Sequence, residues 1–441
     1  MITISKTALA AALLAGAGAI ATASPAMAAK QKDAQTQQTP QLKLSDEFRK
    51  AAGPAQQALN SGDYATAATG ITAAEAAAKT DDERYVAAQL RLALLAKQQQ
   101  AAGSTPQSDA TLIPPLDALL ANPKTPQDQI GKYANARGTI AFEQKKYADA
   151  ISYFNRAQAA GYQDPNMPLQ IAKAKIESGD IAGGVAQIDT VVKAQEAAGQ
   201  KPSEDLYRYA IAKLYKTNDR ATLLDWVKRW LTAYPSAKNW RDAIIAFGFQ
   251  GPTAAQMGKP EKMDLYRLMS VTGALADRGD YLEYAQYAND LGLPDEAKTV
   301  IAKGKAAGKI PATDSSAATL SKQAANGISS EGSLAALATK AASSAKGELA
   351  SQTADAYLGQ GNYAKAIELY KLALQKGVAK TDLVNMHLGI AEAMSGDKAA
   401  AATQFAAVQT APTKDVATLW QAWAAAGTAA PAAPAPAAPQ G

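Results

Sequence analysis

The stretch ADAYLGQGNYAKAIELYKLA, residues 354–373, has a counterpart in GTIAFEQKKYADAISYFNRA, residues 138–157. Both place an aromatic residue directly after a turn, a small residue three positions later and a second aromatic four positions after that. These residues are Tyr363, Ala366 and Tyr370 in one stretch, and Tyr147, Ala150 and Phe154 in the other. Spacings of three and four are typical of one helix face. Their recurrence indicates stacked helical pairs, which form binding surfaces more often than enzymes.

Short polar turns recur along the chain and predict the junctions between paired helices. They lie 34 residues apart from Lys145 to Gly179, 35 from Gly361 to Gly396 and 39 from Gly179 to Asn218. Glycine accepts the left-handed conformation that ends a helix, and Asp or Asn can cap the next one. The predicted turns are Gly62-Asp63-Tyr64, Lys145-Lys146-Tyr147, Gly179-Asp180-Ile181, Asn218-Asp219, Gly279-Asp280-Tyr281, Gly361-Asn362-Tyr363 and Gly396-Asp397-Lys398. Small residues three positions further on let the helices approach: Ala67, Ala150, Gly184, Ala366 and Ala401.

Helix starts can be read from capping residues. Ser45 opens the first helix, and Thr80 with Glu83 predicts a capping box. Further starts are predicted at Pro202-Ser203-Glu204-Asp205 and Pro294-Asp295-Glu296, where acidic residues suit the helix dipole. The proline-rich stretch 102–129 predicts a short helix around Leu116–Leu120.

With these motifs the chain resembles the tetratricopeptide-repeat (TPR) family. The resemblance implies an all-α fold, a TPR-like right-handed α-solenoid of antiparallel helix pairs whose concave groove binds peptides or proteins. The clearest units are 131–164, 165–199, 347–381 and 382–411, with weaker ones at 48–80, 203–235 and 263–291. The family's tryptophan in the first helix is absent from the best units, and its proline at the unit end is mostly missing.

The amino-acid composition excludes several classes of fold and function. The chain has 441 residues, of which 47% are hydrophobic and 19% charged, and its net charge is +5. An alanine-rich chain without sustained alternating strands favours helices over sheets. The small net charge and the lack of an arginine-rich stripe argue against nucleic-acid binding. Because the sequence has no cysteine, disulfides, thiolate nucleophiles and cysteine metal sites are excluded.

The N-terminus has the pattern of a secretory signal. Lys6 precedes an uncharged, mostly apolar run, and Ala26-Met27-Ala28 fits the small-x-small cleavage rule. We therefore expect an exported, periplasmic protein that is soluble, is not lipidated and has no transmembrane span after cleavage. The expected organisation is a signal peptide at 1–28, a flexible lead-in at 29–44, a degenerate repeat array at 45–303, a joint at 304–325, a C-terminal repeat pair with flanking helices at 326–426, and a disordered Ala/Pro-rich tail at 427–441.

Catalytic residues are not predicted. The only histidine is His387, and no nucleophile elbow or metalloprotease motif is present. A single histidine without cysteine can form neither a His/Cys metal cluster nor a Cys–His dyad, so we expect no enzyme activity, metal or cofactor. A pocket that joined several carboxylates from distant units would reopen the enzyme hypothesis.

Two groups of residues are candidates for binding. Lys132, Asn135 and Thr139 share one face of a first helix, and the next unit offers Asn166, Gln170 and Lys173. The TPR resemblance implies that lysine and asparagine on such faces grip a terminal carboxylate; a solvated helix face is the alternative. His387, in the first helix of the last clear unit, could also point into the groove; an ordinary solvated or packed histidine is the alternative.

The second group is aromatic. Residues 206–287 hold 13 of the 28 aromatic residues, among them Trp226, Trp230, Tyr281 and Tyr284. They either fill gaps between helices or form a recognition patch for a peptide or glycan. An exposed cluster would favour the patch, and a buried one would count against it.

The sequence thus predicts a non-enzymatic periplasmic scaffold or adaptor that binds another protein or peptide of the cell envelope through its groove. A small-ligand or glycan-binding module that uses the aromatic segment is the alternative.

Overall fold

The computed structural model describes residues 42–103, 106–250 and 253–425, and these residues form helices without any strand. The predicted signal peptide, nearly all of the lead-in and the Ala/Pro-rich tail lie outside the described residues. The chain divides into two compact units, one ending at Pro202 and the other beginning at Ser203. The all-α fold of TPR-like helix pairs predicted from the sequence is confirmed. None of the described helices has both the length and the apolar character needed to span a membrane.

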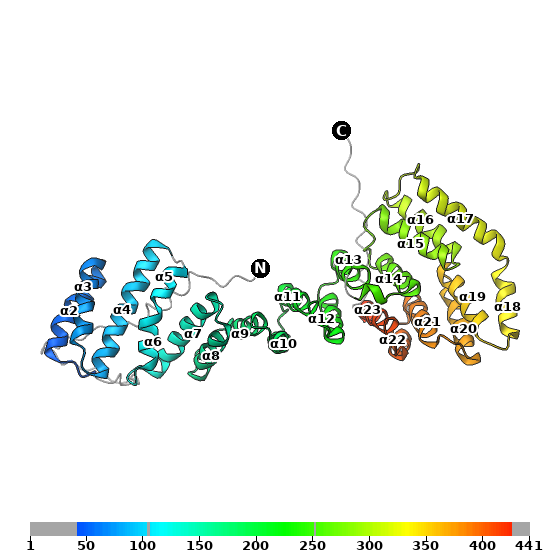
Figure 1. Cartoon of the computed structure of the whole chain (residues 1–441). Coiled ribbons are helices and arrows are strands. Elements are labelled where there is room, and N and C mark those ends of the chain that lie inside the picture. Colours follow the sequence, from blue (N-terminus) through cyan, green and yellow to red (C-terminus); the bar gives the residue numbers. More distant parts are fainter. Residues whose placement is uncertain (1–41, 104–105, 251–252, 426–441) are drawn as a thin grey trace, which may run out of the picture. The chain divides into compact units, whose positions relative to one another are not determined.

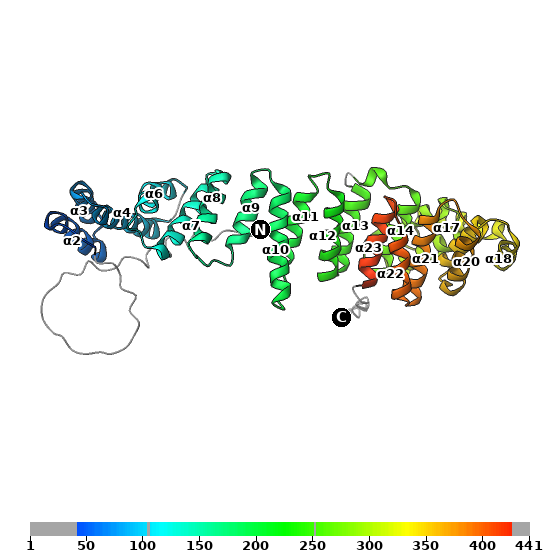
Figure 2. The ribbon, with the colours of Figure 1, turned by 90° about the horizontal axis from the view of Figure 1, so that it is seen from below.

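The first unit is a succession of antiparallel helix pairs. Helices α2 and α3, α7 and α8, and α9 and α10 pack as pairs, and α8 packs against α9. Figure 2 shows α7 to α10 following one another side by side. The bounds are α2 (Asp46–Ser61), α3 (Tyr64–Ala77), α4 (Asp81–Ala102), α5 (Pro106–Thr111), α6 (Ile113–Ala121), α7 (Gln127–Glu143), α8 (Tyr147–Ala159), α9 (Met167–Glu177) and α10 (Ile181–Ala197). Helix α6 is the short helix predicted within the proline-rich stretch.

The second unit adds unpaired helices to the same plan. Its bounds are α11 (Glu204–Leu214), α12 (Arg220–Ala233), α13 (Ala237–Ile244), the π-helix η1 (Ile245–Gln250), the 3₁₀ turn η2 (Ala254–Gln256), α14 (Lys259–Val271), α15 (Arg278–Asp290), α16 (Pro294–Ala306), α17 (Ser315–Glu331), α18 (Leu334–Ser343), α19 (Glu348–Gly359), α20 (Tyr363–Lys376), α21 (Thr381–Ser395), α22 (Lys398–Ala407) and α23 (Thr413–Ala425). The predicted joint at 304–325 lies inside this unit, where α17 packs against α15 and α16.

Capping side chains start the helices where the sequence predicts. The Ser45 side chain accepts from Phe48 N, and Thr80 and Glu83 form the predicted capping box. The Glu83 carboxylate also accepts from Ser45 N at 2.9 Å and Lys79 N at 2.8 Å. Its hydrogen bonds with Ser45, Lys79 and Thr80 lower the pKa of Glu83 to about 2. One carboxylate therefore ties the start of α2 to the start of α4.

One predicted turn is wrong. Gly279-Asp280-Tyr281 lies inside the first turns of α15, because Asp277 is the N-cap and its side chain accepts from Asp280 N. The chain turns earlier, at Gly273, which has a φ of 71°. Asp280 completes a capping box three residues after Asp277, so its carboxylate serves the helix start rather than a junction.

Close approach of the paired helices explains the small residues after the turns. Ala67, Ala150, Ala366 and Ala401 are fully buried. At Gly184 a Cβ atom would lie 2.3 Å from Ile176 Cγ1 and 2.7 Å from the carbonyl oxygen of Ala172. Any larger side chain there would push α10 away from α9.

The last helix of the second unit returns to its first helices. Helix α23 packs against α12 and α14 as well as α21 and α22, and Figure 1 shows it in red beside the green helices. The fully buried Trp420 donates its Nε1–H to the carbonyl oxygen of Asp264 at 3.1 Å. Thr413 bonds Glu261 at 2.8 Å, and Arg220 pairs with Asp415. The second unit is therefore closed on itself, which the repeat pattern did not predict.

Candidate functional site

Seven buried or half-buried polar residues of the second unit are joined by hydrogen bonds and ion pairs into one line, which we call the buried network. Six helices contribute: α14 supplies Asp264 and Arg267, and α15, α16, α19, α20 and α21 supply one residue each. Along the line the residues are Tyr284, Glu296, Arg267, Asp264, His387, Asp355 and Tyr370.

His387 is the centre of the network. Its Nδ1 lies 2.6 Å from Asp355 Oδ1, and its Nε2 lies 3.2 Å from Asp264 Oδ2. The Tyr370 hydroxyl donates to the same Asp355 Oδ1 at 2.6 Å, and the rings of Tyr370 and His387 meet edge to face. Each imidazole nitrogen thus faces its own carboxylate.

Arg267 forms the other half. It donates from Nη1 to Asp264 Oδ1 at 2.8 Å, and from Nε and Nη2 to both oxygens of Glu296 at 2.9 and 2.7 Å. Tyr284 adds a bond to Glu296 Oε1 at 2.7 Å. This two-point contact is the strong, planar arrangement of arginine and carboxylate. The guanidinium therefore already has carboxylate partners on two helices.

Charge in the network does not cancel. Three carboxylates face one guanidinium and one imidazole, so the net charge is −1 even when His387 is protonated. Burial alone would lower the pKa of His387, but the charges of Asp264 and Asp355 outweigh it and raise the pKa to about 10. Burial would likewise raise the pKa of Asp355, yet the His387 charge and the bonds from His387 and Tyr370 hold it below its ordinary value. His387 is consequently an imidazolium at neutral pH.

A pocket of about 430 Å³ opens beside the network. Arg267, Asp355 and His387 line it together with Gln352 and Thr353. Its apolar lining comes from α14, the α15–α16 connection, α18, α19 and α21, through Pro260, Met263, Leu291, Leu293, Leu337, Leu349 and Leu383. The pocket thus has a charged floor and leucine walls.

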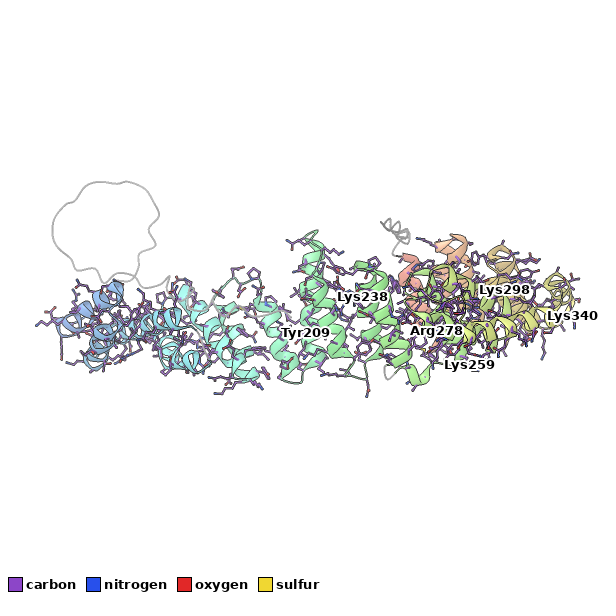
Figure 3. All side chains as sticks on the ribbon, turned by 90° about the horizontal axis from the view of Figure 1, so that it is seen from above. Tyr209, Lys238, Lys259, Arg278, Lys298 and Lys340 are labelled. Atoms are coloured by element: carbon purple, nitrogen blue, oxygen red, sulfur yellow. The ribbon has the colours of Figure 1, made fainter. Side chains whose placement is uncertain are left out.

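Some charged residues on the outside of the unit form pairs of their own. Lys259, Arg278 and Lys298, which Figure 3 labels on the second unit, are exposed. Lys259 pairs with Asp290 at 2.8 Å, and Arg278 pairs with Asp314. Exposed pairs of this kind contribute little to stability.

Carboxylates from distant repeats do meet here, which is the arrangement that would reopen the enzyme hypothesis. A general base must be unprotonated near the working pH, so His387 does not suit this role, because the two carboxylates keep it protonated. Among the described residues no group of three or more His, Asp and Glu side chains is arranged to hold a metal ion.

The predicted polar face in the first unit is partly buried. Lys132 and Asn135 are half-buried, and Thr139, Gln170 and Lys173 are buried. The Thr139 hydroxyl donates to the Asn135 carbonyl oxygen at 3.1 Å, within its own helix. Burial lowers the pKa of Lys173. The first-unit candidates thus lie on α7 and α9, which are the first helices of two successive pairs. Both helices pack against neighbouring helices of the first unit.

The aromatic candidates are core residues. Trp226, Trp230, Tyr281 and Tyr284 expose 2%, 4%, 9% and 4% of their surfaces. Trp226 packs edge to face on Tyr207, and Trp230 donates to Glu204 Oε1 at 3.0 Å. Tyr284 stacks on Tyr266 and belongs to the buried network. The condition set for a recognition patch is not met, because these rings fill the gaps between helices.

Sequence reasoning found His387 and Tyr284 but missed their partners. Asp264 and Arg267 are three apart in α14, which resembles an ordinary exposed helix pair. The available signal was their setting, since Met263, Leu265 and Leu268 surround them and are buried as well. Charged residues within an apolar run indicate a buried ion pair.

Comparisons with known proteins add only distant similarities. No family model and no curated protein matches the chain. Among solved structures, it is similar to the TPR2AB domain of yeast Sti1 in a complex with pHSP90, with a TM-score of 0.23, 13% identity and coverage of 67% of this chain and 99% of that one. For yeast Tom70 the TM-score is 0.22 and the identity 11%, with coverage of 86% of this chain and 95% of that one. For the maize pentatricopeptide repeat protein PPR10 the TM-score is 0.26 and the identity 13%, with coverage of 86% of this chain and 61% of that one. Similarity at this level does not indicate a shared ligand.

Proposed function

We propose that the protein is a non-enzymatic scaffold or adaptor whose first unit binds an extended peptide segment of a partner protein. The binding surface is the side of α7 and α9 that carries Lys132, Asn135, Thr139, Gln170 and Lys173, here called the α7–α9 face. The observation that carries the proposal is a pair of buried amide oxygens, Asn135 Oδ1 and Gln170 Oε1, that no donor from the described residues reaches.

A buried acceptor without a donor costs about 1–3 kcal/mol. A peptide backbone offers N–H groups at regular intervals, so an extended segment supplies donors to both oxygens once the two side chains turn outward. The helices that carry the two amides are rigid, which lowers the ordering cost of binding. Lys132 and Lys173 add positive charge to the face, which favours a ligand segment that carries a carboxylate.

We further propose that the protein acts in the periplasm of a bacterium, where the partner is a protein of the cell envelope that takes part in assembly or transport. The N-terminal pattern of residues 1–28 supports this location. The small net charge supports a protein partner over a nucleic acid.

The test is site-specific photo-crosslinking in the native cell envelope, with the photoreactive residue at Lys132. The matched control places it at Asn155, an exposed residue on the second helix of the same pair. We expect one discrete protein product from Lys132 that is missing from Asn155. Mass spectrometry then gives the crosslinked segment, and a synthetic peptide of that segment serves as the ligand.

Binding of this peptide is measured with the wild type and with an Asn135→Ala, Gln170→Ala double variant. We expect the variant to weaken binding about tenfold or more, equivalent to about 1.4 kcal/mol. Identical products from Lys132 and Asn155, or equal affinity of both proteins for the peptide, would contradict the proposal.

A further inference from the structure

Asp355 brings an unused hydrogen-bonding atom to the pocket of the second unit. A second such atom, His387 Nε2, forms an ion pair with Asp264 but no hydrogen bond within the described residues. Asp355 uses Oδ1 to accept from both His387 and Tyr370. Its Oδ2 receives no hydrogen bond from the described residues, and the Asp355 side chain is 23% exposed and lines the pocket. The carboxylate therefore presents a free acceptor to whatever enters.

The cations of the floor are already engaged. Arg267 directs Nε, Nη1 and Nη2 to Asp264 and Glu296, and both nitrogens of His387 face carboxylates. Of the charged residues of the network, only Arg267, His387 and Asp355 line the pocket, so the sign of the ligand follows from the free atoms and not from a sum of charges. An anionic ligand would have to displace one of the existing partners, whereas a cation can bond to Asp355 Oδ2 without displacing any of them.

The leucines that line the pocket indicate the apolar part of the ligand. Leu337, Leu349 and Leu383, from three different helices, are half-buried and line the pocket. Apolar side chains left half-exposed around a charged floor suit a ligand with an aliphatic body, because its burial removes apolar surface from water.

We propose that this pocket binds a primary aliphatic amine, with the ammonium group on Asp355 Oδ2 and the hydrocarbon chain among the leucines. The amine is either a free alkylamine or the side chain of a lysine residue in a protein. The site is independent of the α7–α9 face, because it lies wholly within the second unit.

The test is isothermal titration of the full-length protein with hexylamine, hexanol and hexanoate, which share a chain and differ in charge. We expect hexylamine to bind at least about tenfold more tightly than the other two. Hexanoate binding as well as hexylamine, or no binding of hexylamine up to about 10 mM, would overturn the proposal.

A substitution at Asp355 tests whether the ammonium group of the ligand binds there. Asp355→Asn keeps an oxygen for Tyr370 but removes the charge, and we expect the hexylamine affinity to fall about 10- to 100-fold, as for a hydrogen bond to a charged group. The control is Asp225→Asn, the same change at an acid whose side chain is 61% exposed, which should bind as the wild type does. Unchanged affinity of Asp355→Asn would overturn the proposal.

If Asp355→Asn fails to fold, a substitution at Gln352 tests the same position of the ammonium group. Gln352 is exposed, lines the pocket and lies three residues before Asp355 on α19. Gln352→Lys supplies an ammonium from the protein itself and should weaken hexylamine binding, whereas Gln352→Met, of similar length but neutral, should not. Equal affinities of these two variants would contradict the assignment.

A peptide arm distinguishes the two sources of the amine. The pentapeptide Ala-Ala-Lys-Ala-Ala, with both termini blocked, is titrated alongside hexylamine. Tighter binding of the peptide would support a lysine of a partner protein as the ligand, and tighter binding of hexylamine would support a free amine.

Discussion

The imidazolium of His387 lies between two carboxylates in a buried setting, so its protonation contributes to the stability of the second unit. A buried charge that loses its partner is strongly destabilising, by about 3–5 kcal/mol. The contributions of the seven residues of the buried network to stability are therefore coupled, and the effect of replacing any one of them depends on the others.

The first prediction at this scale concerns pH. The pKa of His387 is raised from the model-peptide value of 6.5 to about 10 in the folded protein. Below pH 6.5 both states carry the proton and its stabilisation is complete; between pH 6.5 and 10 only the folded state keeps it. The free energy of unfolding should therefore fall as pH rises through this window, by up to about 1.4 kcal/mol per unit. Urea unfolding followed by tryptophan fluorescence between pH 6.5 and 9 measures this slope.

The control for this slope is His387→Gln, which removes the titrating group and keeps a polar side chain. We expect the variant to be less stable at pH 6.5 and to show a flatter dependence on pH. The tyrosines of the network do not interfere below pH 9, because burial raises the pKa values of Tyr284 and Tyr370 well above 10. A wild-type slope retained in the variant would show that another group is responsible.

Residue-scale chemistry was only partly predictable from the sequence. His387 could be proposed because it is the only histidine, but Asp264 and Asp355 lie 123 and 32 residues before it and on different helices. Which side chains meet across a closed set of helices depends on tertiary packing. Local spacing carries no information about such pairings, so the partners of His387 had to come from the structure.

At the scale of elements, glycine and alanine at helix crossings determine how closely a pair can pack. At Gly184, Ile176 and Ala172 of α9 leave no room for a Cβ atom. Overpacking of this kind typically costs 1–3 kcal/mol or more.

The element-scale prediction is that Gly184→Leu destabilises the first unit by at least about 1–3 kcal/mol, since α9 and α10 must separate. The matched control is Ala186→Leu, an exposed position two residues further along α10, which should change stability by less than about 0.5 kcal/mol. Circular dichroism at 222 nm during urea unfolding is the measurement. Equal effects of both substitutions would mean that the crossing does not restrict residue size.

Elements were the most predictable part of the molecule. Ser45, Thr80 with Glu83, and Asp63 act as the caps that their residue types indicate, because a cap is a local interaction within four residues. The failure at Gly279 has a local reason too. Asp277 and Asp280 are both acceptable caps, and the helix starts at the earlier one, where both carboxylates can be used.

At the scale of the whole chain, the repeat pattern predicted an array but neither its division after Pro202 nor the closure of the second unit. Closure depends on α23, whose Trp420 packs against helices more than a hundred residues earlier. A repeat pattern specifies how each helix pair meets the next one. The contact of α23 with α12 and α14 joins helices far apart in the sequence, so the local pattern does not specify it.

The two units can be followed separately, because all five tryptophans lie in the second unit, at positions 226, 230, 240, 420 and 423. Tryptophan fluorescence therefore reports the second unit alone, whereas circular dichroism reports the helices of both. We predict that Trp420→Ala lowers the stability seen by fluorescence by about 3–5 kcal/mol, the usual cost of emptying a buried tryptophan site. Trp423→Ala, at a half-buried position of the same helix, should cost less.

The first unit has its own hydrophobic core, running from Phe48 to Ala174. Its unfolding is the part of the dichroism change that has no counterpart in fluorescence. We expect the midpoint of this transition to stay the same in Trp420→Ala and to shift in Gly184→Leu. A shift of both transitions by either substitution would mean that the units unfold as one, and closure by α23 would then stabilise both units rather than the second unit alone.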